Sequence, residues 1–70
     1  MAKVTFIAGA AEITVDLTDE ERKELRFALR KANIAVESHH RLILNGNPAT
    51  LDTPVKDGDE VGVVGNKSAG

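Results

Sequence analysis

Two short clusters of polar side chains are the parts of this sequence whose residue types could bind a metal ion. His39 and His40 are adjacent, and Asp57 and Asp59 alternate one residue apart. Imidazole suits zinc, but neighbouring residues on an extended chain point to opposite sides, and no third ligand is evident. Carboxylates suit calcium, but the further oxygen ligands and closing glutamate of a calcium loop are missing. We therefore interpret the histidines as a solvated loop and the aspartates as part of a turn, with no metal site.

The composition excludes several other kinds of chemistry. The 70 residues contain no cysteine, which rules out disulfides, a thiolate nucleophile and cysteine-based metal sites. Nine Lys and Arg against eleven Asp and Glu give a net charge of -2, which argues against nucleic acid as a main partner. We find no catalytic constellation, membrane span or secretory signal. We therefore expect a soluble, cytoplasmic, monomeric protein that is not an enzyme and binds no cofactor.

One small domain must position any functional residue, because 70 residues allow only one core. Residues 12–17 alternate between polar and apolar side chains, and within residues 3–8 every second residue from Val4 to Ala8 is apolar. This pattern is typical of strands with one buried face. The connection over residues 9–11 is short and starts with glycine, so the two strands are predicted to form a hairpin. In the first strand, Thr5 and Ile7 are expected to face away from the core. The residues expected to face inward are Val4, Phe6, Ala8, Ile13, Val15 and Leu17.

An amphipathic helix is predicted over residues 19–32. Thr18 and Glu21 have the spacing of a capping box, and Asn33 is a plausible C-cap. Asp19 and Lys23 have the i, i+4 spacing of a surface ion pair. The predicted buried stripe consists of Leu25, Ala28, Leu29 and Ala32.

The rest of the domain reads as three further strands. Residues 41–44 and 60–64 alternate like half-buried strands, and residues 47–51 could form a short edge strand because Pro48 cannot donate to a central ladder. Asn45-Gly46 is typical of a tight turn.

This order of elements predicts an α+β fold with a mixed sheet of four to five strands and one helix packed on one face. The economical arrangement is a β-grasp, in which the first and last strands lie parallel in the middle of the sheet. We expect residues 1–64 to form this domain and residues 65–70 to form a flexible tail.

The C-terminal part of the chain carries a motif near its end. Residues 53–61 (TPVKDGDEV) are followed by a Val63-Val64 pair and a six-residue tail that ends in Gly70. This pattern resembles the small sulfur-carrier proteins, namely the small subunit of molybdopterin synthase and the thiamine-pathway sulfur carrier, which are ubiquitin-like β-grasp proteins. Residues 41–46 are also similar to the third strand of ubiquitin. The resemblance is detailed over residues 41–70, whereas the preceding residues match only in the order of elements.

The resemblance implies a carrier or modifier role for the C-terminus. In that family a separate adenylating enzyme uses ATP to activate the C-terminal glycine carboxylate, which then carries sulfur as a thiocarboxylate or joins an amine. Here Gly70 would be activated, with Ser68 and Ala69 completing the tail. The family usually has two consecutive glycines, so Ala69 is a departure that adds a methyl group to a tail that must thread a narrow channel. The alternative is a non-conjugating β-grasp module that binds other proteins.

Two aliphatic residues could form a docking surface for the activating enzyme or another protein. Strand alternation places Ile43 and Val64 on the solvent side of the sheet. By resemblance to ubiquitin, both fall where that family has an apolar recognition patch. The alternative is two isolated surface aliphatics, which are common in globular proteins.

Phe27 is a further candidate for partner binding. It lies ~200° around the predicted helix from Leu25, on the side expected to face solvent. An exposed aromatic side chain could anchor a protein partner. Alternatively, the loop of residues 33–40 folds back and covers it.

Overall fold

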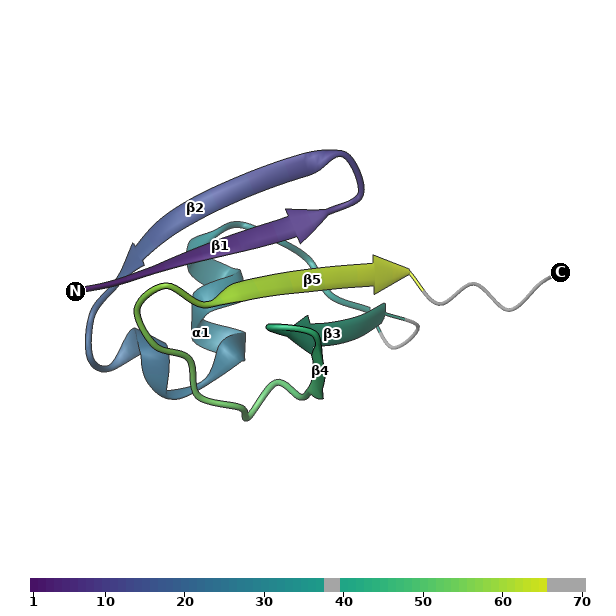
Figure 1. Ribbon diagram of the computed structural model, residues 1–70. Helices are drawn as coiled ribbons and strands as arrows, with labels where there is room; N and C mark the ends of the chain where they lie inside the picture. Colours follow the sequence, from purple (N-terminus) through teal and green to yellow (C-terminus); the bar gives the residue numbers. More distant parts are fainter. Residues whose placement is uncertain (38–39, 66–70) are drawn as a thin grey trace, which may run out of the picture.

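The computed structural model describes residues 1–37 and 40–65 of the chain. The strands follow one another in the predicted order (Figure 1). They are β1 (Ala2–Ala8), β2 (Ala11–Leu17), β3 (His40–Leu44), β4 (Asn47–Ala49) and β5 (Glu60–Gly65). Between β2 and β3 lie a 3-10 turn, η1 (Glu21–Lys23), and an α-helix, α1 (Leu25–Lys31).

The strands form one mixed sheet in the order β2-β1-β5-β3-β4. Strands β1 and β5 pair in parallel, with Phe6 opposite Val61, and the other neighbours are antiparallel. The first and last strands therefore lie side by side in the middle, as predicted (Figure 1). Strand β4, which contains Pro48, lies at one edge. The predicted tight turn joins β3 to β4, with Asn45 and Gly46 at φ values of 51° and 88°.

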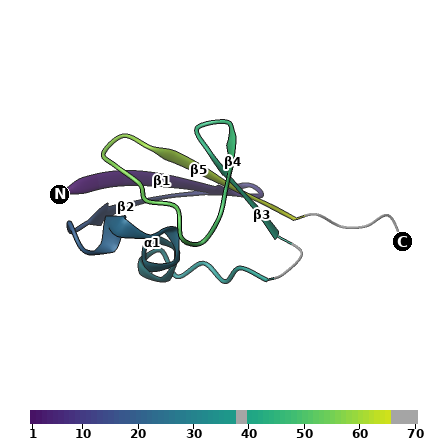
Figure 2. The same cartoon turned by 90° about the horizontal axis from the view of Figure 1, so that it is seen from below.

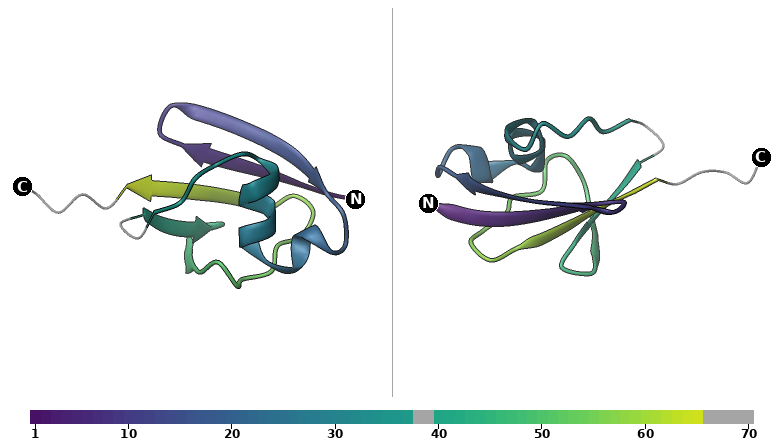
Figure 3. Two further views of the ribbon diagram at one scale, coloured as in Figure 1. Left: turned by 180° about the vertical axis from the view of Figure 1, so that it is seen from behind. Right: turned by 90° about the horizontal axis from the view of Figure 1, so that it is seen from above.

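The helix α1 covers one face of the sheet, here called the inner face (Figures 2 and 3). The alternation predicted for β1 and β5 is confirmed, since Phe6 and Val61 are fully buried against the helix side. In β2, Leu17 is fully buried, while Ile13 and Val15 are partly buried. The core is a single cluster consisting of Ala2, Val4, Phe6, Leu17, Leu25, Ala28, Leu29, Ala32, Leu42, Val55, Val61 and Val63. The stripe predicted for the helix is therefore buried throughout.

The helix is shorter than the sequence predicts, because the chain is interrupted at Glu24. This residue is extended, with φ -143° and ψ 139°, and it separates η1 from α1. The N–H groups of Leu25 and Arg26 donate to the carbonyl oxygens of Thr53 and Leu51, at 2.8 and 3.0 Å. In a continuous helix these two N–H groups would bond to carbonyls of the preceding turn.

The loop before β5 makes a further backbone hydrogen bond to this segment. The carbonyl oxygen of Arg22 accepts the N–H of Val55 at 2.8 Å, and Val55 is buried in the core. Hydrogen bonds between segments distant in sequence thus replace one turn of local helical bonding. Helix propensity and the spacing of apolar residues over positions 19–32 contain no information about these long-range hydrogen bonds. The prediction of one continuous helix is therefore wrong.

Both ends of the helical segment are capped as predicted. The Thr18 hydroxyl accepts the N–H of Glu21 at 3.2 Å, and the Thr18 N–H donates to the Glu21 carboxylate at 2.9 Å, which completes a capping box. At the other end Asn33 has φ 61°, and the N–H of Ile34 donates to the carbonyl oxygen of Leu29 at 2.9 Å. This is a Schellman-type end with asparagine in the left-handed position.

The ion pairs of η1 differ from the predicted pairing. Asp19 binds Arg22 at 3.2 Å, and Glu20 binds Lys23 at 3.1 Å. Side chains three positions apart lie over each other in a 3-10 turn, so the i, i+3 pairs form in place of the predicted Asp19–Lys23 pair.

The loop that contains Asp57 and Asp59 is a hydrogen-bonded turn. Asp57 accepts the backbone N–H of Lys3 at 2.8 Å. Asp59 is buried, and its two carboxylate oxygens accept the N–H of Lys56 at 2.8 Å and the side-chain amide of Asn45 at 2.9 Å. The prediction that these aspartates belong to a turn is therefore confirmed.

No helix in the described part of the chain is long and apolar enough to cross a membrane.

Candidate functional site

Strands β3 and β5 bring Ile43 and Val64 together on the sheet face opposite the helix, here called the outer face. In the register of these antiparallel strands Arg41 lies opposite Val64 and Ile43 lies opposite Gly62. Residues directly opposite each other share a face, so Ile43 and Val64 are diagonal neighbours on the outer face. Val64 is 45% exposed and Ile43 is partly buried. The structure thus places both residues on the face that the alternation predicted.

A third aliphatic side chain joins them from β1. Ile7 lies opposite Gly62 in the parallel pairing of β1 with β5. Gly62 therefore sits between Ile7 and Ile43, and its missing side chain leaves a shallow hollow of about 530 Å³. We call the four residues Ile7, Ile43, Gly62 and Val64 the outer patch. The prediction of the site did not include Ile7 or Gly62, although alternation in residues 3–8 did place Ile7 on this face.

Charged groups lie along the same face at both ends of the outer patch. Glu60 lies two residues before Gly62 on β5, and Arg41 lies opposite Val64 on β3. Both residues are exposed. The outer patch is therefore an apolar strip with a carboxylate near one end and a guanidinium near the other, which is the arrangement of an apolar centre with a polar rim.

The outer patch adjoins the end of the described chain. Strand β5 ends at Gly65, one residue after Val64, at the opposite end of the strand from the turn that contains Asp57. The residues predicted to carry the chemistry, Ser68, Ala69 and Gly70, lie outside the described residues. The activation of Gly70 therefore stays a prediction.

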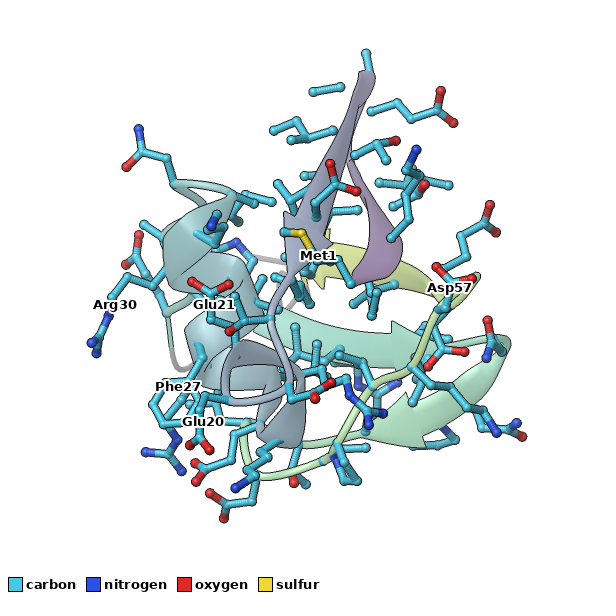
Figure 4. The ribbon with its side chains drawn as sticks, turned by 90° about the vertical axis from the view of Figure 1, so that its left-hand side faces the viewer. Met1, Glu20, Glu21, Phe27, Arg30 and Asp57 are labelled. Atoms are coloured by element: carbon cyan, nitrogen blue, oxygen red, sulfur yellow. The ribbon has the colours of Figure 1, made fainter. Side chains whose placement is uncertain are left out.

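Phe27 lies on α1, away from the outer face (Figure 4). Its side chain is partly buried in a hollow of about 370 Å³, here called the Phe27 hollow, whose lining residues are Glu20, Glu21, Phe27, Arg30 and Lys31. Residues 33–36 line a different hollow, together with Arg26 and Leu51. Residues 33–36 thus do not line the Phe27 hollow, and the alternative in which the loop over residues 33–40 covers Phe27 stays a prediction. Glu20 and Glu21 lie at the start of η1, before the break at Glu24, and the other lining residues lie on α1.

One carboxylate beside this hollow has a shifted pKa. The backbone N–H of Thr18 donates to Glu21 and holds the pKa of its carboxyl below the ordinary value. Partial desolvation opposes this shift, whereas the ammonium group of Lys31, 3.4 Å away, reinforces it. Glu21 is therefore anchored as a carboxylate by the capping box and by the end of α1.

Of the histidine pair His39-His40, only His40, the first residue of β3, lies within the described residues. His39 lies outside the described residues, and Nδ1 of His40 accepts the N–H of Glu37 at 2.8 Å. Within residues 1–37 and 40–65, no three histidine, aspartate or glutamate side chains are grouped so that they could hold a metal ion.

Several solved structures have a fold similar to that of this chain. A crystal structure of SAMP1 from Haloferax volcanii matches with a TM-score of 0.77 and 16% identity, and the match covers 99% of this chain and 100% of that chain. A second structure, of small archaeal modifier protein 1 from H. volcanii, matches with a TM-score of 0.73 and 16% identity over 90% and 95% of the two chains. ATBAG1 in complex with HSP70 matches with a TM-score of 0.63 and 10% identity, over 94% of this chain and 41% of that one.

Comparison of the sequence found no matching protein-family model and no matching curated protein. A mixed five-stranded sheet with one helix on its inner face, together with these structural matches, shows that the chain has the ubiquitin-like β-grasp fold.

Proposed function

We propose that this chain is a ubiquitin-like carrier or modifier whose Gly70 carboxylate is activated by a separate adenylating enzyme. A carboxylate oxygen attacks the α-phosphorus of ATP, which forms an acyl-adenylate and releases pyrophosphate. Hydrosulfide then displaces AMP and leaves a thiocarboxylate, or an amine displaces AMP and leaves an amide. The protein supplies the reacting carboxylate, and the partner enzyme supplies the nucleotide site and the catalytic groups.

The observation that carries this proposal is the position of the outer patch along β5. Val64 belongs to the patch and is followed immediately by Gly65, where the strand ends. Strand β5 pairs with β1 as far as Val63 and with β3 as far as Gly65, so β3 holds this end of the strand in the sheet. A protein bound on the outer patch is therefore held beside the point where the chain leaves the sheet.

The remaining length of chain limits the geometry of the partner. Five residues follow Gly65, and a fully extended chain spans at most ~3.5 Å per residue. The Gly70 carboxylate can then lie no more than ~18 Å from the end of β5. The adenylating site of the partner must therefore open within that distance of the surface that contacts Val64.

Mass spectrometry of the intact protein tests the activation directly. The protein is incubated with an adenylating enzyme of the sulfur-carrier type, ATP and a sulfur donor. The expected product is heavier by the difference between one sulfur and one oxygen atom. An Ala69→Gly variant serves as the matched control for the tail, and a variant lacking Gly70 must stay unmodified. If the Ala69→Gly variant is modified and the unaltered chain is not, the proposed activation of Gly70 is wrong.

The role of the outer patch is tested by a pair of variants on the same face. Val64→Asp places a charge in the patch, whereas Thr14→Asp places the same charge on the outer face of the edge strand β2. We expect Val64→Asp to raise the KM for activation about tenfold, the effect of losing one well-packed contact of ~1.4 kcal/mol, and Thr14→Asp to leave it unchanged. If both substitutions raise the KM for activation equally, the outer patch is not the surface that the activating enzyme binds.

The second candidate function is a β-grasp module that binds other proteins without being conjugated. Two features favour it, namely Ala69 in place of a glycine and the partly exposed ring of Phe27. Under this alternative the chain is never modified at its C-terminus, while substitutions at its surfaces still weaken partner binding. The mass measurement above therefore separates the two candidates.

A further inference from the structure

We propose that the Phe27 hollow is a second protein-docking site, for a partner segment in which a large apolar side chain stands beside a carboxylate. The apolar side chain would pack on the ring of Phe27, and the carboxylate would pair with Arg30. This proposal does not depend on the activation of Gly70, because it uses a different surface of the domain.

The fold has no need of an aromatic side chain at position 27. The chain has two phenylalanines and no tryptophan or tyrosine. Phe6 is fully buried in the core, whereas Phe27 is partly exposed and does not belong to the core cluster. The helix is held on the sheet by other residues, which are Leu25, Ala28 and Leu29. Phe27 is thus the one phenylalanine ring of the described residues that the surface offers to a partner.

The charges around the ring define what kind of partner fits. Glu20 is paired with Lys23 at 3.1 Å. Glu21 accepts hydrogen bonds from the Thr18 N–H and from Lys31, at 2.9 and 3.4 Å. Both carboxylates of the hollow are therefore already engaged by cations or by the backbone, so they offer little to a cationic partner.

Arg30 is the charged group of the hollow that is left over. Within residues 1–37 and 40–65 its guanidinium makes no hydrogen bond and no ion pair, and its side chain is exposed. Arg30 follows Phe27 by three positions, so both side chains lie on the same surface of α1. A guanidinium binds a carboxylate through two parallel hydrogen bonds, which makes an acidic residue its natural partner.

The site is also set in place before any partner arrives. The capping box fixes Glu21, and the Glu21–Lys31 contact holds η1 against the end of α1. Figure 4 shows the Phe27 ring between Glu20, which lies below it in this view, and Glu21 and Arg30, which lie above it. A pre-formed pocket with an aromatic floor and an available arginine has the composition of an interface hot spot. Since α1 covers the inner face of the sheet, a partner bound here leaves the outer patch free.

Titration of the full isotope-labelled chain with two capped tetrapeptides, followed by NMR, tests the proposal. One peptide has an aspartate next to a phenylalanine, and the other has asparagine in place of the aspartate. We expect millimolar aspartate peptide to shift the amide signals of residues 20, 21, 27, 30 and 31, and to leave those of the outer patch unshifted. The asparagine peptide should bind about two- to fivefold more weakly, as for a solvent-exposed ion pair.

An Arg30→Gln variant completes the measurement as a double-mutant cycle. The substitution should weaken binding of the aspartate peptide by the same two- to fivefold and leave binding of the asparagine peptide unchanged. The reason is that Arg30→Gln and the change of aspartate to asparagine in the peptide remove the same ion pair. Equal binding of both peptides to the unaltered chain, shifts centred on other residues, or no shifts at all would overturn the proposal. Shifts of the same amides on concentrating the protein alone would identify a second copy as the occupant, and would overturn it too.

Discussion

Asn45 and Asp59 tie the β3–β4 turn to the start of β5. The side-chain amide of Asn45 donates to the carboxylate of Asp59 at 2.9 Å, and its side-chain oxygen accepts the N–H of Glu60 at 2.9 Å. The backbone N–H of Asn45 also donates to the carbonyl oxygen of Glu60 at 2.9 Å. One asparagine, in the left-handed conformation that this residue tolerates well, therefore fixes the register of the strand that carries Val64.

Replacing Asp59 should be costly to the fold. Asp59→Ala removes the acceptors of the Lys56 N–H and the Asn45 amide in a buried turn. We expect the free energy of unfolding in urea to fall by about 2–3 kcal/mol, since donors that lose a buried partner carry a desolvation penalty. Asp57→Ala is the matched control, because this exposed aspartate accepts one hydrogen bond, and it should cost about 1 kcal/mol. Equal losses would show that burial of the turn contributes nothing.

The capping box predicts a specific dependence of stability on pH. The folded-state pKa of Glu21 lies below its unfolded value of ~4.3, so the carboxylate contributes stability above that value. This contribution is lost as the pH falls through the lowered folded pKa. In Glu21→Gln the contribution is absent at every pH. The difference in unfolding free energy between the two proteins should therefore be constant above about pH 5 and shrink below about pH 4. A constant difference down to pH 2 would contradict the assignment.

Leu25 should be among the residues on which stability most depends. It is fully buried at the start of α1, directly after the break at Glu24. Leu25→Ala should lower the free energy of unfolding by about 2–5 kcal/mol, which is a large part of the stability of a small domain. Leu51→Ala makes the same change at a side chain that is 39% exposed, and it should cost much less. Thermal unfolding followed by circular dichroism provides the comparison.

A substitution of Gly62 should weaken docking at the outer patch without lowering the stability of the fold. A Cβ placed on Gly62 meets only Ile43, at 3.9 Å, and its backbone does not have a positive φ. Gly62→Ala therefore fits without strain and should stabilise the strand by about 0.5–1 kcal/mol. The added methyl group partly fills the hollow between Ile7 and Ile43, so the KM for activation should rise while stability also rises. A loss of stability would show that the strand cannot accept a side chain here.

Phe27 should contribute moderately to stability. Its ring is only partly buried, so Phe27→Ser should cost about 1 kcal/mol, well below the 3–5 kcal/mol of an aromatic residue lost from a core. Phe6→Ser is the control, because that ring is fully buried, and it is expected to prevent folding. A cost of several kcal/mol at position 27 would mean that the ring is part of the core.

The sequence was a good guide wherever the signal was local. Alternation in β1, β2 and β5 depends on which face of a strand is buried, and the capping box depends on residues three positions apart. The break at Glu24 could not be predicted, because it depends on carbonyl groups of Thr53 and Leu51 that only the folded chain brings near. Ile7 was placed on the correct face, but its partnership with Gly62 requires the parallel pairing of two strands more than fifty residues apart.

That parallel pairing has a consequence for synthesis of the protein. The strand β5, in the middle of the sheet, follows the other four strands in the chain, so the nascent chain holds two separate hairpins, each with an open edge, until residues 60–65 have left the ribosome. Open edges of this kind are prone to pair with other chains. Contacts between segments so far apart in sequence also form slowly. Closure of the domain is therefore a late, single event, and a ribosome-bound chain that stops before residue 60 should be sensitive to proteases and to aggregation.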